Sequence, residues 1–302
     1  MKLRERLNTI AEITRHPSNT GRRAGAVLKY LRWNFGHRAL GTDYIMPLVG
    51  TARLILSDRQ NYATLVYTCQ LWGFAEQAFL LHFLRPDDLF VDVGANVGGY
   101  TVLASAVAGA RSMAFEPVPS TFAELQRNVR LNDIGHLVQA YCCALGETAG
   151  KSRMTAHRGG LNHMVFDADA LQPVAETVEV ATDRLDSMLD GAPCQAIKMD
   201  AEGFELSILR GAPDTLSRAS LQAIVVELNS SGTRYGVTDD HVHQSIIQFG
   251  FEPCSYNART RELAVLPSYN RRGLSTLYIR DRQAVIKRLA GGRPFALGDQ
   301  SF

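Results

Sequence analysis

From about residue 86 onward, short apolar runs alternate with segments of helical periodicity, and this alternation constrains the fold more than any other feature of the sequence. Strand-like runs occupy 89–93, 112–117, 137–145, 195–200 and 221–228. The segments between them carry apolar residues at helical spacing, as in VGGYTVLASAVAGA and FELSILRGAP. Strands and helices that alternate in this way predict a doubly wound, mostly parallel α/β sheet.

The connection between the third and fourth predicted strands, residues 146–194, is too long for a simple turn. Within it, KSRMTAH and TVEVATDRL alternate like the two arms of a hairpin or like edge strands. They flank the polar loop GGLNHMVFDADALQP. We therefore expect an inserted β-hairpin and loop region beside the main sheet.

The two ends of the chain extend this core. STLYIR, at 275–280, predicts a final strand that pairs antiparallel at the edge of the sheet. Residues 1–85 are expected to form a helical, basic extension that acts as a lid, and residues 86–302 the ligand-binding domain.

The chain has 302 residues, of which 46% are hydrophobic, so it can bury one large core or two modest ones. Its formal net charge of +2 is too small to predict nucleic-acid binding. Residues 1–40 nevertheless hold nine Lys or Arg against Glu5 and Glu12. Such an arm is either a solvated extension or a contact for anionic lipid or an acidic polymer.

The cysteines and the apolar runs bear on compartment. Five cysteines without any C-x-x-C pair disfavour a metal-thiolate site and indicate free thiols in a reducing compartment. No run approaches eighteen apolar residues, and no apolar signal segment follows the charged N-terminus. We therefore expect a soluble, cytoplasmic protein.

The stretch LFVDVGANVGGY, residues 89–100, joins the first strand to a glycine-rich turn and a helix, an arrangement that binds ligands at the carboxyl edge of a parallel sheet. Asn96 stands where a dinucleotide fold has its second glycine, and no Lys-Ser or Lys-Thr pair follows the turn, so NAD and nucleoside triphosphates are disfavoured. Glu116, ending the second strand, can accept ribose hydroxyls, and Asp92 can face an ammonium. S-adenosylmethionine carries both groups, whereas the simpler reading makes Asp92 a helix cap and Glu116 an ordinary strand-end charge.

Four ordered segments resemble the motifs of the FkbM-type S-adenosylmethionine-dependent methyltransferases: VDVGANVGGY, AFEPVPSTFAELQRNVRLN, IKMDAEGFELSILRGA and IVVEL. The resemblance covers roughly residues 75–230. It implies a class I methyltransferase fold, which is Rossmann-like with a seven-stranded sheet, and O-methylation of sugars, glycans or natural products. It further implies three groups of cofactor-binding residues: Asp92, Gly94, Asn96 and Gly98 at the methionine portion; Glu116, followed by Pro117, at the ribose; and Asn132, Cys143 and Ala144 at the adenine.

Methyl transfer to a neutral hydroxyl also requires a base or a metal ion. Asp200 and Glu202 follow the fourth predicted strand and are candidate catalytic residues, and Glu227 ends the fifth strand at the same edge. These three carboxylates could together bind Mg²⁺, although Glu202 is equally well explained as a helix-start charge. His163, in the polar loop, is the alternative base.

We therefore predict an S-adenosylmethionine-dependent O-methyltransferase that acts on a hydroxyl of a sugar in a glycan, glycolipid or glycosylated metabolite. The sequence leaves both a monomer and a homo-oligomer open. One alternative is methylation of a carboxylate or a non-sugar small molecule, which needs no base. Another is a binding protein that keeps the cofactor pocket without turnover. A lid formed by the N-terminal extension would bring Tyr62 and Tyr67 toward the acceptor.

Overall fold

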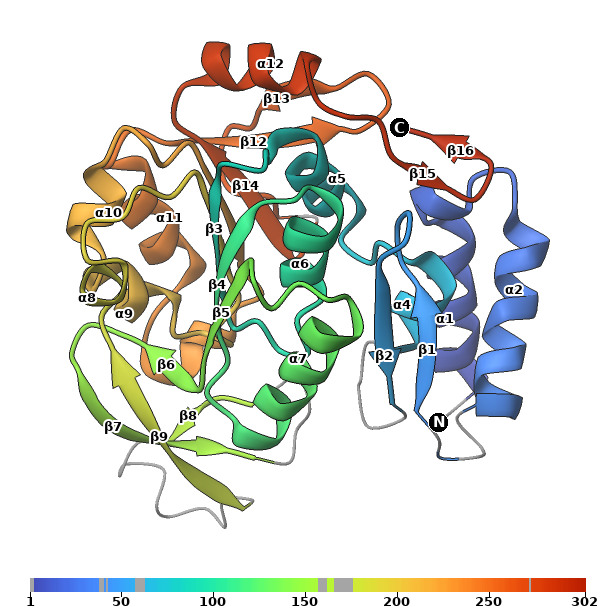
Figure 1. Cartoon of the computed structure of the whole chain (residues 1–302), viewed down its shortest axis with the longest axis horizontal. Coiled ribbons are helices and arrows are strands. Elements are labelled where there is room, and N and C mark those ends of the chain that lie inside the picture. Colours follow the sequence, from blue (N-terminus) through green and yellow to red (C-terminus); the bar gives the residue numbers. More distant parts are fainter. Residues whose placement is uncertain are drawn as a thin grey trace.

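The computed structural model describes residues 3–37, 41, 43–57, 63–156, 162–165, 176–271 and 273–302. Its centre is an eight-stranded sheet in the order β13-β12-β14-β11-β10-β3-β4-β5, with helices on both faces (Figure 1). The strands are β3 (Leu89–Val93), β4 (Arg111–Phe115), β5 (Val138–Tyr141), β10 (Ala196–Met199), β11 (Ala223–Glu227), β12 (Glu252–Asn257), β13 (Glu262–Val265) and β14 (Ser275–Ile279).

Strands β5, β4, β3, β10 and β11 run parallel, and β3 lies at their centre. Every residue of β3 is buried, which explains its unbroken apolar pattern, because a parallel strand covered on both faces has no solvent side. Val91 packs in the core under the helices that follow β10 and β11, whereas Phe90 faces the core shared with the N-terminal region. The predicted doubly wound α/β architecture is confirmed.

The other end of the sheet is antiparallel. β14 pairs antiparallel with both β11 and β12, so it lies inside the sheet, and the expected edge position for 275–280 is wrong. β13 follows β12 in a hairpin and adds an eighth strand to the seven that were predicted. The edge is therefore formed by β13, whose side chains are mostly exposed.

The predicted third strand divides at Cys142 into two strands that belong to different sheets. β5 stays in the main sheet, whereas β6 turns into a four-stranded sheet of order β6-β9-β7-β8. This small sheet contains the predicted hairpin strands, and most of the polar loop between them lies outside the described residues. Its strands are β6 (Cys143–Leu145), β7 (Gly150–Thr155), β8 (Met164–Val165) and β9 (Thr177–Asp183).

The helices follow the predicted positions with shifted ends. The helix after the glycine-rich turn starts as α6 and continues as a π-helix over Leu103–Val107. The next helix, α7, begins with Pro119 in its first turn, directly after Val118. The helices of the main domain are α6 (Gly99–Val102), α7 (Pro119–Leu131), α8 (Leu185–Leu189), α9 (Glu205–Arg210), α10 (Pro213–Ser217), α11 (Asp239–Ile247) and α12 (Arg282–Ala290).

The N-terminal region combines helices with a β-hairpin that the sequence did not predict. Its elements are α1 (Leu3–Arg15), α2 (Arg23–Arg32), a π-helix (Trp33–His37), β1 (Tyr44–Pro47), β2 (Arg53–Leu56), α4 (Ala63–Cys69) and α5 (Phe74–Phe83). Strand β2 contacts α7, whose Asn128 accepts a hydrogen bond from the Ile55 amide at 2.8 Å. Trp33 and Leu54 share one apolar core with β3, so this region packs directly onto the main sheet.

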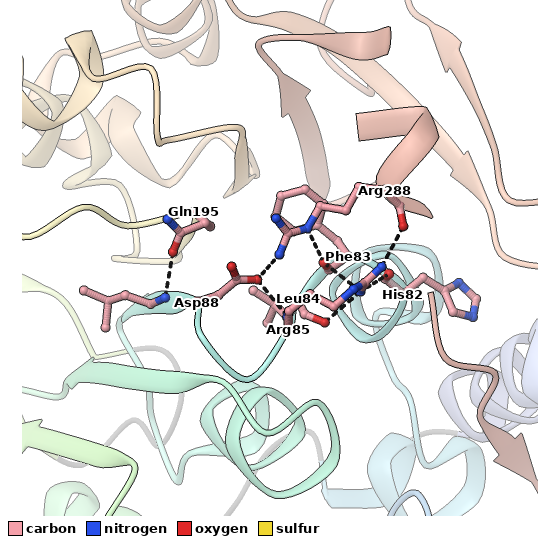
Figure 2. Close-up of polar contacts among 8 residues, drawn as sticks. His82, Phe83, Leu84, Arg85, Asp88, Gln195 and Arg288 are labelled. Atoms are coloured by element: carbon pink, nitrogen blue, oxygen red, sulfur yellow. Dashed lines mark hydrogen bonds and ion pairs between the residues drawn. The ribbon is translucent and has the colours of Figure 1, made fainter. Parts of the chain in front are cut away.

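The C-terminal helix α12 is fastened to the end of α5 by two arginines (Figure 2). Arg288 pairs with Asp88 and donates to the Phe83 carbonyl at 2.7 Å, and its guanidinium lies over the Phe83 ring. Arg85 donates to the Arg288 carbonyl at 2.6 Å and to three carbonyls at the end of α5, those of His82, Phe83 and Leu84. These bonds satisfy carbonyls that the end of a helix leaves without intrahelical partners.

We expect Arg288→Ala to lower the free energy of unfolding by about 2–3 kcal/mol, since hydrogen bonds to charged groups contribute about 1.5–3 kcal/mol each and are partly screened here. Lys287→Ala is the matched control, because Lys287 lies on the exposed side of the same helix. Urea unfolding of both variants measures the difference. Equal stabilities would contradict a fastening role for Arg288.

Candidate active site

The glycine-rich turn after β3 is held between the ends of β4 and β10. The amides of Gly94 and Ala95 both donate to the Phe115 carbonyl, at 3.0 and 2.9 Å. Gly94 has φ of +70°, and a Cβ there would lie 1.8 Å from the Asp200 carbonyl oxygen. Glycine is therefore required at 94 for the turn to pack against the end of β10.

Glu116 sits where β4 ends and holds two loops in place. One of its oxygens accepts from the Asn96 amide at 3.0 Å, and the other accepts from the Val118 amide at 2.9 Å. Burial raises the pKa of Glu116 to about 7. Because a carboxylate oxygen can accept two hydrogen bonds, each oxygen keeps capacity for a ligand hydroxyl.

A pocket opens between these loops and the small sheet. Its apolar lining comes mainly from Phe115, Leu145, Met154, Met164, Phe204 and Ile208. Its polar lining comes from Asn96, Glu116, Thr121, Asn162, Asp200 and Glu202. A flat aromatic group fits the apolar part, and a ribose fits the carboxylate of Glu116, so the donor and acceptor set matches S-adenosylmethionine.

The structure brings together most of the residues that the sequence assigned to the cofactor. Those that line the pocket are Gly94, Asn96, Glu116, Pro117, Cys143 and Ala144. Asp92 and Gly98 instead lie beneath the turn. Asp92 is fully buried and accepts from the Thr101 hydroxyl at 2.6 Å, and burial raises its pKa. A Cβ on Gly98 would meet Leu125, so this glycine allows α7 to pack closely.

Two predicted site residues lie away from the pocket. Asn132 is bonded to the backbone of Arg53 in β2, accepting from its amide and donating to its carbonyl at 2.8 Å each. The expected adenine contact by Asn132 is therefore wrong, because its amide fastens the N-terminal hairpin. His163 pairs through its backbone with Thr155, while its neighbours Asn162 and Met164 line the pocket. His163 itself is not among the lining residues, which follows from the alternation of side chains along an extended chain.

At the carboxyl end of β10, a lysine that the sequence analysis overlooked organises the carboxylates. The Lys198 ammonium donates to the Gly94 carbonyl and to Asp200, each at 3.1 Å. The Lys198 side chain is only 8% exposed, whereas that of Asp200 is 31% exposed and lines the pocket. Lys198 is also the register partner of Asp92 in the pairing of β10 with β3, so one cation lies beside the carboxylates of both Asp92 and Asp200.

The protonation states of this cluster differ from one carboxyl to the next. Burial alone would raise the pKa of Asp200, but Lys198 and a hydrogen bond with Glu227 hold it below its ordinary value. Burial and the negative charge of Asp200 raise the pKa of Glu227. At neutral pH, Asp200 is therefore a carboxylate flanked by the Lys198 ammonium and by the neutral carboxylic acid of Glu227, which donates a hydrogen bond to it.

The loop after Asp200 is tightly shaped. Glu202 adopts φ of +50°, and Gly203, at φ of +99°, would place a Cβ 2.5 Å from the backbone of Ser231. Glu205 accepts from the amides of Ala201 and Gly203 at 2.9 and 3.2 Å and braces the loop without lining the pocket. Glu202 does line the pocket, where it accepts from the Ser231 hydroxyl at 3.3 Å.

The predicted Mg²⁺ site at Asp200, Glu202 and Glu227 receives no support. No group of three His, Cys, Asp or Glu side chains in the described part of the chain is arranged to hold a metal ion. The positive charge beside Asp200 comes from Lys198. Tyr67, expected near the acceptor, packs against the rings of Trp33 and Tyr44, and Tyr62 lies outside the described residues.

Three features define a class I methyltransferase domain. The central parallel strand β3 ends in a glycine-rich turn, and the neighbouring strand β4 is followed by the carboxylate of Glu116. The antiparallel strand β14 lies between β11 and β12. Residues 92–253 match the methyltransferase FkbM domain. This chain belongs to the FkbM methyltransferase family.

The chain is similar to two relatives and to one solved structure. Methyltransferase 1 of Beauveria bassiana (strain ARSEF 2860) is 32% identical over 151 residues, which cover 43% of this chain and 60% of that protein. The 31-O-demethyl-FK506 methyltransferase FkbM of Streptomyces tacrolimicus is 30% identical over 175 residues, covering 47% and 66%. The crystal structure of methyltransferase FkbM from Methylobacillus flagellatus KT aligns with a TM-score of 0.45 and 17% identity over 72% of this chain and 53% of that one. The chain thus spans between half and two thirds of each of these proteins.

Proposed function

We propose that this protein transfers the methyl group of S-adenosylmethionine to a hydroxyl oxygen, with Asp200 as the general base. The observation that carries the proposal is the state of Asp200: an ionised carboxylate that reaches the pocket while Lys198 and Glu227 hold its charge. A base is needed for a hydroxyl acceptor and not for a carboxylate. The Streptomyces relative supports an oxygen acceptor, because its name specifies 31-O-demethyl-FK506.

The pocket residues suit the three parts of the cofactor. The apolar wall of Phe115, Leu145 and Ile208 would take the adenine, and Glu116 would accept the ribose hydroxyls. The backbone from Gly94 to Asn96 would lie along the methionine portion. When bound, the cofactor supplies an activated methyl group on a sulfonium centre.

The chain's own part in the reaction is to orient the acceptor and take its proton. Asp200 would accept a hydrogen bond from the acceptor hydroxyl and then its proton as the oxygen forms its bond to the methyl carbon. Lys198 keeps Asp200 ionised before the reaction, and Glu227 stabilises its charge through the hydrogen bond that it donates. Proton transfer to a positioned base contributes about 10²–10⁴-fold to rate.

We further propose that the hydroxyl belongs to a sugar in a glycan, glycolipid or glycosylated metabolite, an assignment supported by the motif resemblance. The test uses S-adenosylmethionine with a labelled methyl group and paired acceptors, for example methyl glucoside and methyl glucuronic acid. Labelling of hydroxyls in the sugar panel supports the proposal. Labelling confined to carboxylates contradicts it, and cofactor binding without transfer to any of a broad acceptor panel favours a binding protein.

Cofactor affinity is expected to depend on the ionisation of Glu116. Its pKa of about 7 means that S-adenosylhomocysteine should bind about tenfold more weakly at pH 6 than in the alkaline limit, because the neutral acid is a poorer acceptor for ribose hydroxyls. Glu116→Gln should bind weakly at both pH values and lose this dependence. Calorimetric titration across pH 6–8.5 measures both proteins. A wild-type affinity that stays constant over this range would contradict the ribose role.

A further inference from the structure

Helix α2 and the π-helix after it expose a row of large apolar side chains. Leu28, Leu31 and Phe35 are 58%, 41% and 72% exposed, and they recur at the i, i+3, i+7 spacing of one helical face. Arg32 lies within the same row and is also exposed. We call Leu28, Leu31, Arg32 and Phe35 the α2 outer face; a shallow depression lies at Leu31, Arg32, Phe35 and Gly36.

This face is not a leftover of the core, because α2 already buries its opposite side. Ala26 and Tyr30 pack against Ile13 of α1 and Cys69 of α4. Trp33 enters the main core and fixes the orientation of the π-helix. A helix whose inner face is satisfied gains nothing in folding from an outer apolar row, and contiguous exposed apolar groups indicate an interaction surface.

The exposed charges of α1 and α2 indicate which kind of partner the α2 outer face would bind. Exposed basic residues on α1, α2 and the turns between them outnumber exposed acidic ones: Arg6, Arg15, Arg23, Lys29 and Arg32 stand against Glu12. Apolar side chains flanked by arginine and lysine on a surface helix match the boundary between the head groups and acyl chains of an anionic bilayer. No helix in the described ranges has the length and apolar character to cross a membrane, so contact would be from one side.

The position of the outer face agrees with a surface-bound enzyme. In Figure 1, α2 forms the outer border of the molecule, and its C-terminal end lies toward the same end of the molecule as the small sheet that walls the pocket. We propose that the α2 outer face docks the protein onto an anionic lipid membrane. The proposal stands apart from the acceptor assignment, since its test needs no turnover.

The test is sedimentation of the full chain with phosphatidylcholine vesicles that contain or lack phosphatidylglycerol. The wild type should bind the anionic vesicles, and salt should weaken that binding. The double variant Leu31→Ser/Phe35→Ser should bind tenfold or more weakly, since each loses an apolar side chain contributing on the order of 1 kcal/mol or more. Arg32→Gln should lose about fivefold, which corresponds to about 1 kcal/mol per basic residue near an anionic surface.

Leu274→Ser is the matched control, because Leu274 is 66% exposed in the loop before β14. It should bind vesicles as the wild type does, and circular dichroism should show all variants folded. Equal binding to both kinds of vesicle, or none to either, would overturn the proposal. If Arg32→Gln weakens vesicle binding and the double variant does not, the partner is an acidic polymer instead of a membrane. Concentration-dependent dimerisation that the double variant abolishes, without vesicle binding, would identify a second copy of the chain as the partner.

Discussion

Asp200→Asn should lower kcat for methylation of a hydroxyl acceptor by about 10²–10⁴-fold, while the affinity for S-adenosylhomocysteine changes only a few-fold. The amide keeps the size of the carboxylate, and its oxygen can still accept from Lys198, but it cannot take a proton. Single-turnover kinetics with saturating cofactor isolates the transfer step, and calorimetry follows binding. A loss in affinity as large as the loss in kcat would instead assign Asp200 to cofactor binding.

Glu202→Gln is the matched comparison, because Glu202 lines the same pocket two residues further along and is engaged by Ser231. It should retain most of the activity. The pH profile adds an independent criterion. Since Lys198 and Glu227 hold the pKa of Asp200 below its ordinary value, the rate should stay high through neutral pH and fall only at pH values below the ordinary carboxyl range. With the cofactor kept saturating at every pH, so that Glu116 does not limit binding, a rate that rises with an apparent pKa near 7 would point to another base, such as His163.

The central strands could be predicted because their signal is local. β3, β4, β10 and β11 are short apolar runs ended by turns or charged residues, and each lies within a residue or two of its predicted span. The ends of those strands also located Glu116 and Asp200, since parallel strands bring their carboxyl ends to one edge. The fold class and the strand-end carboxylates Glu116 and Asp200 therefore follow from sequence periodicity, whereas the other predicted pocket residues were assigned through the family resemblance.

What escaped prediction depends on contacts between distant segments. The break at Cys142, which sends β6 to the small sheet, is set by pairing with β9 nearly forty residues away. The β1–β2 hairpin is fixed by Asn128 of α7 and by Asn132, which directly follows that helix, and nothing local in AFEPVPSTFAELQRNVRLN distinguishes that use from a ligand contact. His243 is likewise buried by a distant partner, since its Nδ1 lies 2.9 Å from the Tyr278 hydroxyl across the helix–sheet interface.

The role of Lys198 is the one missed feature that could have been predicted from the sequence. A lysine in the middle of the apolar run QAIKMD, next to Asp92 in any register that aligns the glycine-rich turn with the D-x-E-G loop, predicts a buried ion pair. We expect Lys198→Met to lower the free energy of unfolding at neutral pH by about 3–5 kcal/mol, because it leaves the fully buried carboxylate of Asp92 and the partly exposed carboxylate of Asp200 without their cation. Urea unfolding at several pH values measures this loss.

The pH dependence separates an ion-pair effect from a packing defect. In the wild type, the lowered pKa of Asp200 stabilises the fold above the ordinary carboxyl pKa, and this stabilisation is lost as pH falls. Without Lys198, burial raises the pKa values of the carboxyl groups, so protonation at low pH removes part of the destabilisation of the variant. The difference in free energy of unfolding between the wild type and Lys198→Met should therefore become smaller as pH falls toward 4. Lys151→Met is the control, since Lys151 pairs with Glu179 at a shorter 2.7 Å on an open surface and should show no measurable change. If Lys198→Met lowers the free energy of unfolding as little as Lys151→Met does, then Lys198 does not hold Asp200 ionised. The assignment of Asp200 as the general base would then be wrong, because it depends on that ionised state.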